Sequence, residues 1–370
     1  MISKQSSIII NNLKCILCIG VVYIHGFNLE EISSIMGGVE NFSHFMQFEQ
    51  WFRRGILDAT CVPMFFAISG YLFFYKIPEN CNFSVFPPKW KSRITSILVP
   101  YLIANLITVT LVICSEGKVF SMSRFLAAFW DGKGGSPIDI PTWYLRDLMI
   151  VCLFAPAIYW AIAKAKYTIV LLFIAAWLTG FWFTSLPGFE VKSFVFFTIG
   201  GYYALIKNDV VKSLDSLRYK WTIAVVYLLF WMVSQMYSIE WILRLSVLIS
   251  LPLWIILSCG VYRLLKIECS KTFVSATFFC FLYHIAVSHR VTALITCLLG
   301  RSEIGLFISF FISGLLTALL FFILYFGLKR FLPKTTRILV GGRSYISLKI
   351  LIYKSIQFDN IESGKLVNIK

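Results

Sequence analysis

The feature that most constrains this chain is a series of apolar runs, each close to the roughly 20 residues that an α-helix needs to cross a bilayer. Inside a membrane the backbone polar groups must be bonded within the protein, and helices bond them within one segment. The sequence therefore predicts an all-α, polytopic integral membrane bundle of about ten transmembrane helices. They are expected at residues 7–28, 55–75, 94–114, 142–163, 167–185, 191–206, 221–239, 242–265, 273–299 and 304–328.

The composition excludes a soluble globular protein. Hydrophobic residues make up 58% of the chain and charged residues only 14%, whereas about 25% of the residues in soluble domains are charged. The ten cysteines lie mostly inside apolar runs without metal-ligand spacing, so we interpret them as small core residues and expect no metal site. The first apolar run lacks a signal-peptidase site, which predicts that it is retained.

The basic residues predict the orientation of the bundle. If the ten helices alternate in direction, most of the 34 Lys and Arg residues fall on the side that holds both termini, and the positive-inside rule makes that side cytoplasmic. The net charge of +16 is then explained by topology and lipid headgroups, without nucleic-acid binding. We expect one membrane domain over 1–328 and a basic cytoplasmic tail over 329–370, with an amphipathic segment at Tyr345–Tyr353 lying on the membrane surface.

Two ionisable residues, Lys14 and His25, interrupt the first apolar run. Such residues are costly in a bilayer and persist mainly where they line a cavity or have a partner. Their eleven-residue spacing places both on one helix face, about 16 Å apart along the axis. His25 could accept a proton from a hydroxyl, with Glu30 or Glu31 orienting its ring. The alternative is that His25 only ends a helix at the headgroup level.

Four further segments hold residues that could either form a binding site or serve only packing and anchoring of the helices. The Pro63–Tyr71 segment holds Ser69 and Gly70 and predicts either a pocket wall or close helix packing. A basic run predicts either phosphate binding or anchoring to anionic lipid. An aromatic segment with a charged pair suits a sugar site or an interfacial belt, and a Tyr-His pair suits a substrate site or a contact between helices. The residues of these last three segments are Lys89, Lys91 and Arg93; Trp143, Arg146 and Asp147; and Tyr283 and His284.

Taken together, these motifs resemble the membrane acyltransferase 3 family, which includes bacterial surface-polysaccharide O-acetyltransferases. The resemblance is carried by Lys14 followed after ten residues by His25, by the Phe65–Leu72 segment, by the basic run up to Arg93 with Pro100-Tyr101, by Trp143–Leu148 and by Phe281–His284. The family usually has Arg where this chain has Lys14, and lysine keeps the charge but loses the planar fork.

The resemblance implies that acyl-CoA is used from the cytoplasm and that the acyl group reaches a sugar hydroxyl on the far side. Its catalytic residues would be His25, Lys14 and Glu31. Coenzyme A phosphates would bind Lys89, Lys91 and Arg93. The acceptor would contact Trp143, Arg146, Asp147, Ser69, Tyr283 and His284.

These observations predict an O-acyltransferase of the bacterial inner membrane that transfers an acetyl group to a cell-envelope glycan, such as an O-antigen, or to a lipid-linked saccharide. Acetyl-CoA would be its donor substrate, and no permanently bound cofactor is expected. The rival interpretation is a transporter or flippase for a polysaccharide, a lipid-linked sugar or a small solute. Ten helices with buried charges suit that class equally well before the resemblance is considered.

Overall fold

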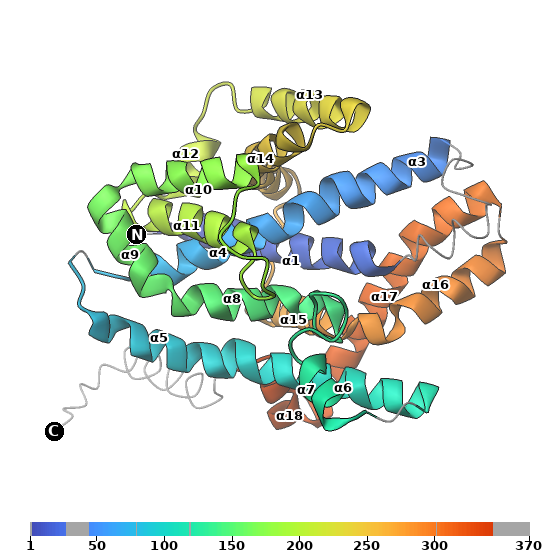
Figure 1. The fold of residues 1–370 in the computed structure, drawn as a ribbon. Coiled ribbons are helices and arrows are strands. Elements are labelled where there is room, and N and C mark those ends of the chain that lie inside the picture. The colour runs from blue at the N-terminus through green and yellow to red at the C-terminus, as the bar shows by residue number, and fades with distance from the viewer. Residues whose placement is uncertain (1, 27–43, 79, 118–119, 301, 343–370) are drawn as a thin grey trace, which may run out of the picture.

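The computed structural model describes residues 2–26, 44–78, 80–117, 120–300 and 302–342. Across these ranges the regular structure is helical, apart from one isolated bridge between Lys133 and Ser136. The helices gather into one bundle, with α1 (Lys4–Gly26) in its middle (Figure 1). The predicted all-α class is therefore confirmed.

Five helical stretches are long and apolar enough to cross a membrane. Three of them are single helices: α1, α14 (Glu240–Leu265) and α17 (Glu303–Phe331). The other two are continuous series of shorter elements. One consists of α3 (His44–Gln50), η2 (Trp51–Asp58) and α4 (Ala59–Phe74), and the other of η3 (Phe83–Val85), α5 (Phe86–Arg93), η4 (Ile94–Leu98) and α6 (Val99–Glu116).

Two further spans are broken. One joins η5 (Ile140–Thr142) and α8 (Trp143–Leu153) to α9 (Ala155–Ala165) with a bend of 58°, and the other joins α15 (Lys271–Tyr283) to α16 (Ile285–Leu299) with a bend of 79°. If each broken pair counts as one span, the described chain has up to seven.

The ten predicted ranges all fall on helices, but the count of ten membrane crossings is not confirmed. Three of the ranges hold helices of 13, 15 and 16 residues, namely α10 (Tyr167–Thr179), α11 (Val191–Leu205) and α13 (Thr222–Tyr237). These are shorter than the roughly 20 residues that a full crossing requires. The remaining helices are α7 (Met122–Ala128), α12 (Val210–Asp215) and α18 (Pro333–Leu339).

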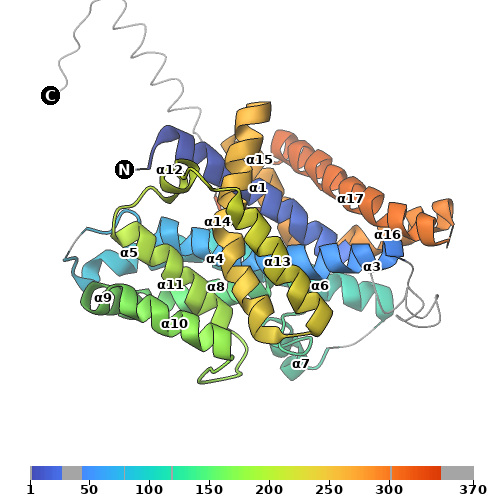
Figure 2. The ribbon, with the colours of Figure 1, turned by 90° about the horizontal axis from the view of Figure 1, so that it is seen from above.

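Helix α1 packs against elements from both halves of the chain. It contacts η2, α4 and the four helices α14 to α17, and Figure 2 shows α14 crossing over it. Near its start the Asn12 side chain donates to the Ile267 carbonyl at 2.7 Å and accepts from the Cys269 amide at 2.8 Å. Further along, the Thr277 hydroxyl contacts the Cys15 sulfur at 3.7 Å. Contacts therefore run in increasing order from Asn12 with Ile267 to His25 with His284, so α15 runs in the same direction as α1.

Helices α4 and α11 approach each other closely through two glycines. A Cβ atom added to Gly70 would lie 2.0 Å from the Phe197 carbonyl oxygen, and one added to Gly200 would lie 1.9 Å from the Ala67 carbonyl oxygen. Small residues at helix contacts allow this approach in membranes. The contact fixes the position of α4, which carries Ser69.

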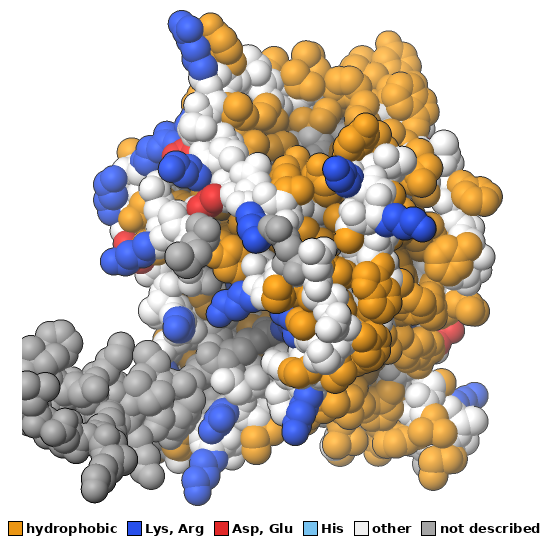
Figure 3. Space-filling model, turned by 90° about the vertical axis from the view of Figure 1, so that its left-hand side faces the viewer, with side chains coloured by type: hydrophobic (Ala, Val, Ile, Leu, Met, Phe, Trp, Pro, Cys, Tyr) orange, Lys and Arg blue, Asp and Glu red, His pale blue; other side chains and the backbone are white. Residues whose placement is uncertain are grey.

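Lys and Arg side chains are spread over the end of the bundle that includes α9 and α12, where Asp and Glu are few (Figure 3). Hydrophobic side chains cover the adjoining flank. This distribution agrees with the predicted cytoplasmic side, although the orientation of the termini stays a prediction. The division at residue 328 also stays a prediction, and the amphipathic segment expected at Tyr345–Tyr353 lies outside the described residues.

Candidate active site

A cavity of about 230 Å³ lies beside α1 at the level of Lys14. Two cations line it, Lys14 from α1 and Arg93 from the end of α5, together with the hydroxyl-bearing Ser69 and Tyr144. The Ser69 and Tyr144 hydroxyl oxygens are 2.9 Å apart and share a hydrogen bond. We call this space the Lys14 cavity. It unites residues that the sequence assigned to three different roles.

Aromatic side chains close one part of the Lys14 cavity. The ring of Tyr144 lies 5.6 Å from that of Phe65 and 6.2 Å from that of Phe281, centroid to centroid, and all three residues line the cavity. Such tilted and edge-to-face arrangements are favourable between rings. The cavity therefore combines a mostly apolar wall with two cations and one hydroxyl pair.

The three cations of the basic run, Lys89, Lys91 and Arg93, lie in three different environments. The Lys89 ammonium donates to the Phe73 carbonyl at 2.8 Å, at the end of α4, and lies over the Phe73 ring. Lys91 is exposed. Only Arg93 of the three lines the Lys14 cavity. Arg93 immediately precedes the π-helical segment η4, an irregularity that is frequent at functional sites.

His25 lies at the far end of the same face of α1. Its spacing from Lys14 corresponds to about 16 Å along the helix axis. Its ring faces that of His284, with centroids 5.7 Å apart and planes tilted by 44°. Because Phe281 lines the Lys14 cavity, His284 is only one helical turn beyond that cavity.

His284 occupies the bend between α15 and α16, and its backbone amide donates to the Cys280 carbonyl at 3.0 Å. Its Nδ1 atom lies 3.1 Å from the Cys280 carbonyl oxygen and 3.0 Å from that of Phe281. Since carbonyl oxygens only accept hydrogen bonds, Nδ1 carries the hydrogen. The neutral ring then has its lone pair on Nε2, which is buried and has no hydrogen-bond partner among the described residues.

A buried ion pair lies near His25 that the sequence interpretation missed. Arg53 Nε lies 3.0 Å from Glu49 Oε1, and Arg53 is close enough to interact electrostatically with His25. Both residues precede the predicted second span, so they were placed in an outer loop. Their spacing of four residues, an acid and a base one helical turn apart, was the available signal.

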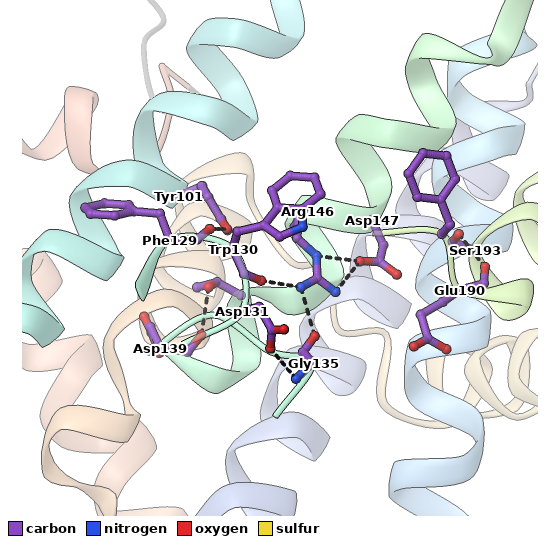
Figure 4. A network of polar contacts seen from close by, with 12 residues as sticks. Tyr101, Phe129, Trp130, Asp131, Gly135, Asp139, Arg146, Asp147, Glu190 and Ser193 are labelled. Carbon is purple, nitrogen blue, oxygen red and sulfur yellow. Dashed lines mark hydrogen bonds and ion pairs between the residues drawn. The ribbon is translucent and has the colours of Figure 1, made fainter. Parts of the chain in front are cut away.

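Arg146 and Asp147 are both buried, and their described contacts are internal (Figure 4). The Arg146 guanidinium bonds to Asp147 Oδ1 at 2.9 and 3.0 Å and donates to the carbonyls of Trp130 and Gly135 at 2.6 and 2.9 Å. The pair thus holds the loop before α8 in place. Trp143 is partly exposed and has the Lys192 ammonium 4.4 Å from its ring centroid.

The remaining residues considered in the sequence analysis are Tyr283, Glu30 and Glu31. The Tyr283 hydroxyl donates to the Leu339 carbonyl at 3.2 Å and so ties α15 to α18. Glu30 and Glu31 lie outside the described residues. The predicted roles of all these side chains in binding or catalysis stay predictions. Among the described residues, no three His, Cys, Asp or Glu side chains gather as a metal site would require.

Comparison with known proteins identifies the family of this chain. A family model described as an acyltransferase domain matches residues 8–341. The succinoglycan biosynthesis protein ExoH of Rhizobium meliloti (strain 1021) is 27% identical over 223 residues, which are 56% of this chain and 56% of that protein. The chain thus spans about half the length of this curated relative. No solved structure matches.

Proposed function

Since the chain belongs to the acyltransferase 3 family, we propose that it is a multi-pass O-acyltransferase of the bacterial inner membrane that acetylates a cell-envelope glycan. The donor in this proposal is acetyl-CoA, taken from the cytoplasmic side. One observation carries it: a single face of α1 presents Lys14 to a cavity that also holds Arg93 and Ser69, and presents His25 farther along.

The donor binds in the Lys14 cavity. Its entrance is marked by Arg93, whose guanidinium can bind phosphate oxygens in a bidentate manner. The mostly apolar wall suits the uncharged arm that joins those phosphates to the thioester. Lys14 and the hydroxyl pair of Ser69 and Tyr144 can donate hydrogen bonds to the phosphates and to the polar groups of that arm.

The acceptor hydroxyl reacts at His25. His25 takes the hydroxyl proton while the hydroxyl oxygen forms a bond to the acyl carbon. The carbon–sulfur bond then breaks, and the departing thiolate takes a proton from the imidazolium, so that the products are the ester and free coenzyme A. Because Lys14 and His25 are about 16 Å apart along α1, the thioester must reach past the cavity toward the histidines.

A polysaccharide acceptor is supported by the similarity to ExoH, which is named as a succinoglycan biosynthesis protein. An O-antigen, a related polysaccharide and a lipid-linked saccharide are acceptors of the same chemistry, since each offers sugar hydroxyls. Membership of the acyltransferase 3 family does not support the rival interpretation of this chain as a transporter.

The test uses membranes from a strain deleted for the gene and complemented with the wild-type chain or with His25→Ala. The membranes receive acetyl-CoA labelled in its acetyl group, and the label in the glycan fraction is measured with and without mild base. We expect base-labile label with the wild type and a loss of about 10²–10⁴-fold with the alanine variant. Equal labelling in the deletion and wild-type membranes would refute the acyltransferase, as a transporter predicts.

A further inference from the structure

Four buried polar atoms near His25 have no hydrogen-bond partner within the described part of the chain. They are His284 Nε2, Ser288 Oγ, Arg53 Nη2 and Glu49 Oε2. Buried polar groups in native proteins are nearly always bonded. We propose that these atoms form the binding site of the acceptor, a neutral saccharide that presents neighbouring hydroxyls. This proposal rests on the acyltransferase function and moves the acceptor site away from Arg146 and Asp147.

Helix α16 supplies one side of this acceptor site. His284, Ser288 and Thr292 are four residues apart, so they share one helix face. That face meets the end of α1, since the His284 ring faces His25 and the Thr292 hydroxyl donates to the Gly26 carbonyl at 2.5 Å. Ser288 lies between these two contacts and is fully buried.

The ion pair supplies the other side. Arg53 Nε and Glu49 Oε1 bond to each other, while one nitrogen and one oxygen of the same pair stay available. The pair is neutral as a whole and offers one donor beside one acceptor. A hydroxyl group both donates and accepts, so a sugar fits this edge, whereas a charged ligand would unbalance the buried pair.

The hydrogen on Nδ1 determines what the other nitrogen of the His284 ring can bind. Because Nδ1 donates to the Cys280 and Phe281 carbonyls, Nε2 can accept from a hydroxyl. The reacting hydroxyl donates to His25, and the adjacent hydroxyl of the same sugar donates to His284 Nε2. His284 is thus a positioning residue that aligns the acceptor.

The decisive comparison is His284→Gln with His284→Asn. The glutamine amide oxygen reaches the place of Nε2, whereas the shorter asparagine keeps only a donor near the Nδ1 position. Acceptor alignment therefore predicts that Gln retains transfer and that Asn lowers it roughly tenfold, the effect of one lost hydrogen bond of the stronger kind. A merely structural role at the helix bend predicts the reverse order.

The experiment measures two reactions in the membranes described above, transfer of labelled acetyl to glycan and binding of acetyl-CoA. A matched control for Ser288→Ala is available, because Ser258 on α14 is also buried and lacks a hydrogen-bond partner in the described chain. We expect Ser288→Ala and His284→Asn to lower transfer while donor binding stays within twofold, and Ser258→Ala to match the wild type.

Three outcomes would overturn the acceptor site. They are equal transfer by the Gln and Asn variants, an equal loss in Ser288→Ala and Ser258→Ala, and a parallel loss of donor binding. Failure of the proposed function has a different signature, since the wild-type membranes themselves would then transfer no label.

Discussion

Replacing Gly70 by alanine should disturb the active site although glycine contributes no side chain to it. The added Cβ would lie 2.0 Å from the Phe197 carbonyl oxygen, where distances below 3.0 Å essentially do not occur. Helices α4 and α11 must therefore separate by about 1 Å or more. The obstacle is backbone and not the end of a flexible side chain, so rotation of a side chain cannot relieve it.

The size of the effect follows from two opposing contributions. Forcing one extra methyl group into a packed contact costs about 1–3 kcal/mol, and alanine returns roughly 1 kcal/mol through its higher helix propensity. We expect a net destabilisation of up to about 2 kcal/mol. Ser69 follows this movement, and a shift of that size stretches its 2.9 Å bond to Tyr144 beyond hydrogen-bonding distance. Apart from the loss of stability, we expect the loss of this hydrogen bond to lower acetyl transfer about threefold to tenfold.

The assay compares Gly70→Ala with Gly327→Ala. Gly327 lies in α17, and a Cβ atom there meets nothing within 4 Å. Thermal stability of the purified protein in detergent should fall for the first variant and stay level or rise for the second, and acetyl transfer should fall only for the first. A Gly70→Ala protein with wild-type stability and activity would refute the close packing of α4 and α11 as the device that positions Ser69.

Three further changes test the cavity and the outer loop. Lys14→Arg should retain transfer, because a cation beside Arg93 is what the cavity supplies, while Lys14→Ala should lower labelled glycan at least tenfold; an active alanine variant would contradict the role. Arg93→Gln should raise the donor KM with a smaller effect on kcat, whereas Lys91→Gln should change neither, and equal KM values would count against the cavity as donor site. Burial raises the pKa of Asp139 to about 8, above the value of about 3.9 in an unfolded chain. The folded protein therefore holds this proton more tightly, and its melting temperature should fall as pH rises between these two values. Asp139→Asn should remove that dependence, and an unchanged slope would contradict the assignment.

Much of the fold could be predicted because helix length and hydrophobicity are local properties. Each predicted range holds a helix, and Lys14 and His25 do lie on one α1 face, since helical geometry fixes that spacing. The sequence also singled out Ser69 and Arg93, which the structure brings to Lys14. It did not show that these residues share a cavity with Lys14, because their proximity depends on the packing of three separate elements, α1, α4 and α5.

The burial of the Arg53–Glu49 pair near His25 illustrates what local patterns cannot give, because the four-residue spacing indicates only that the two side chains can pair. Arg53 lies in η2, a π-helical segment, where five residues separate bonded groups and the face of each side chain departs from the usual 100° steps. His284 likewise lies at a bend of 79° between α15 and α16, and no single residue of the sequence predicts this bend. These features arise from tertiary packing, so they required the structure.

The central position of α1 has a consequence for the synthesis of the protein. Helix α1 emerges before its partners, since Asn12 bonds to residues 255 and 257 positions later, and Tyr23 donates to the Phe311 carbonyl 288 positions later. Until those residues are made, the polar groups of the first helix stand in the bilayer without the partners they have in the finished protein. Chains that stop before α15 should therefore be recognised as unassembled and degraded, and acyl transfer can begin only when the last helices close around the first.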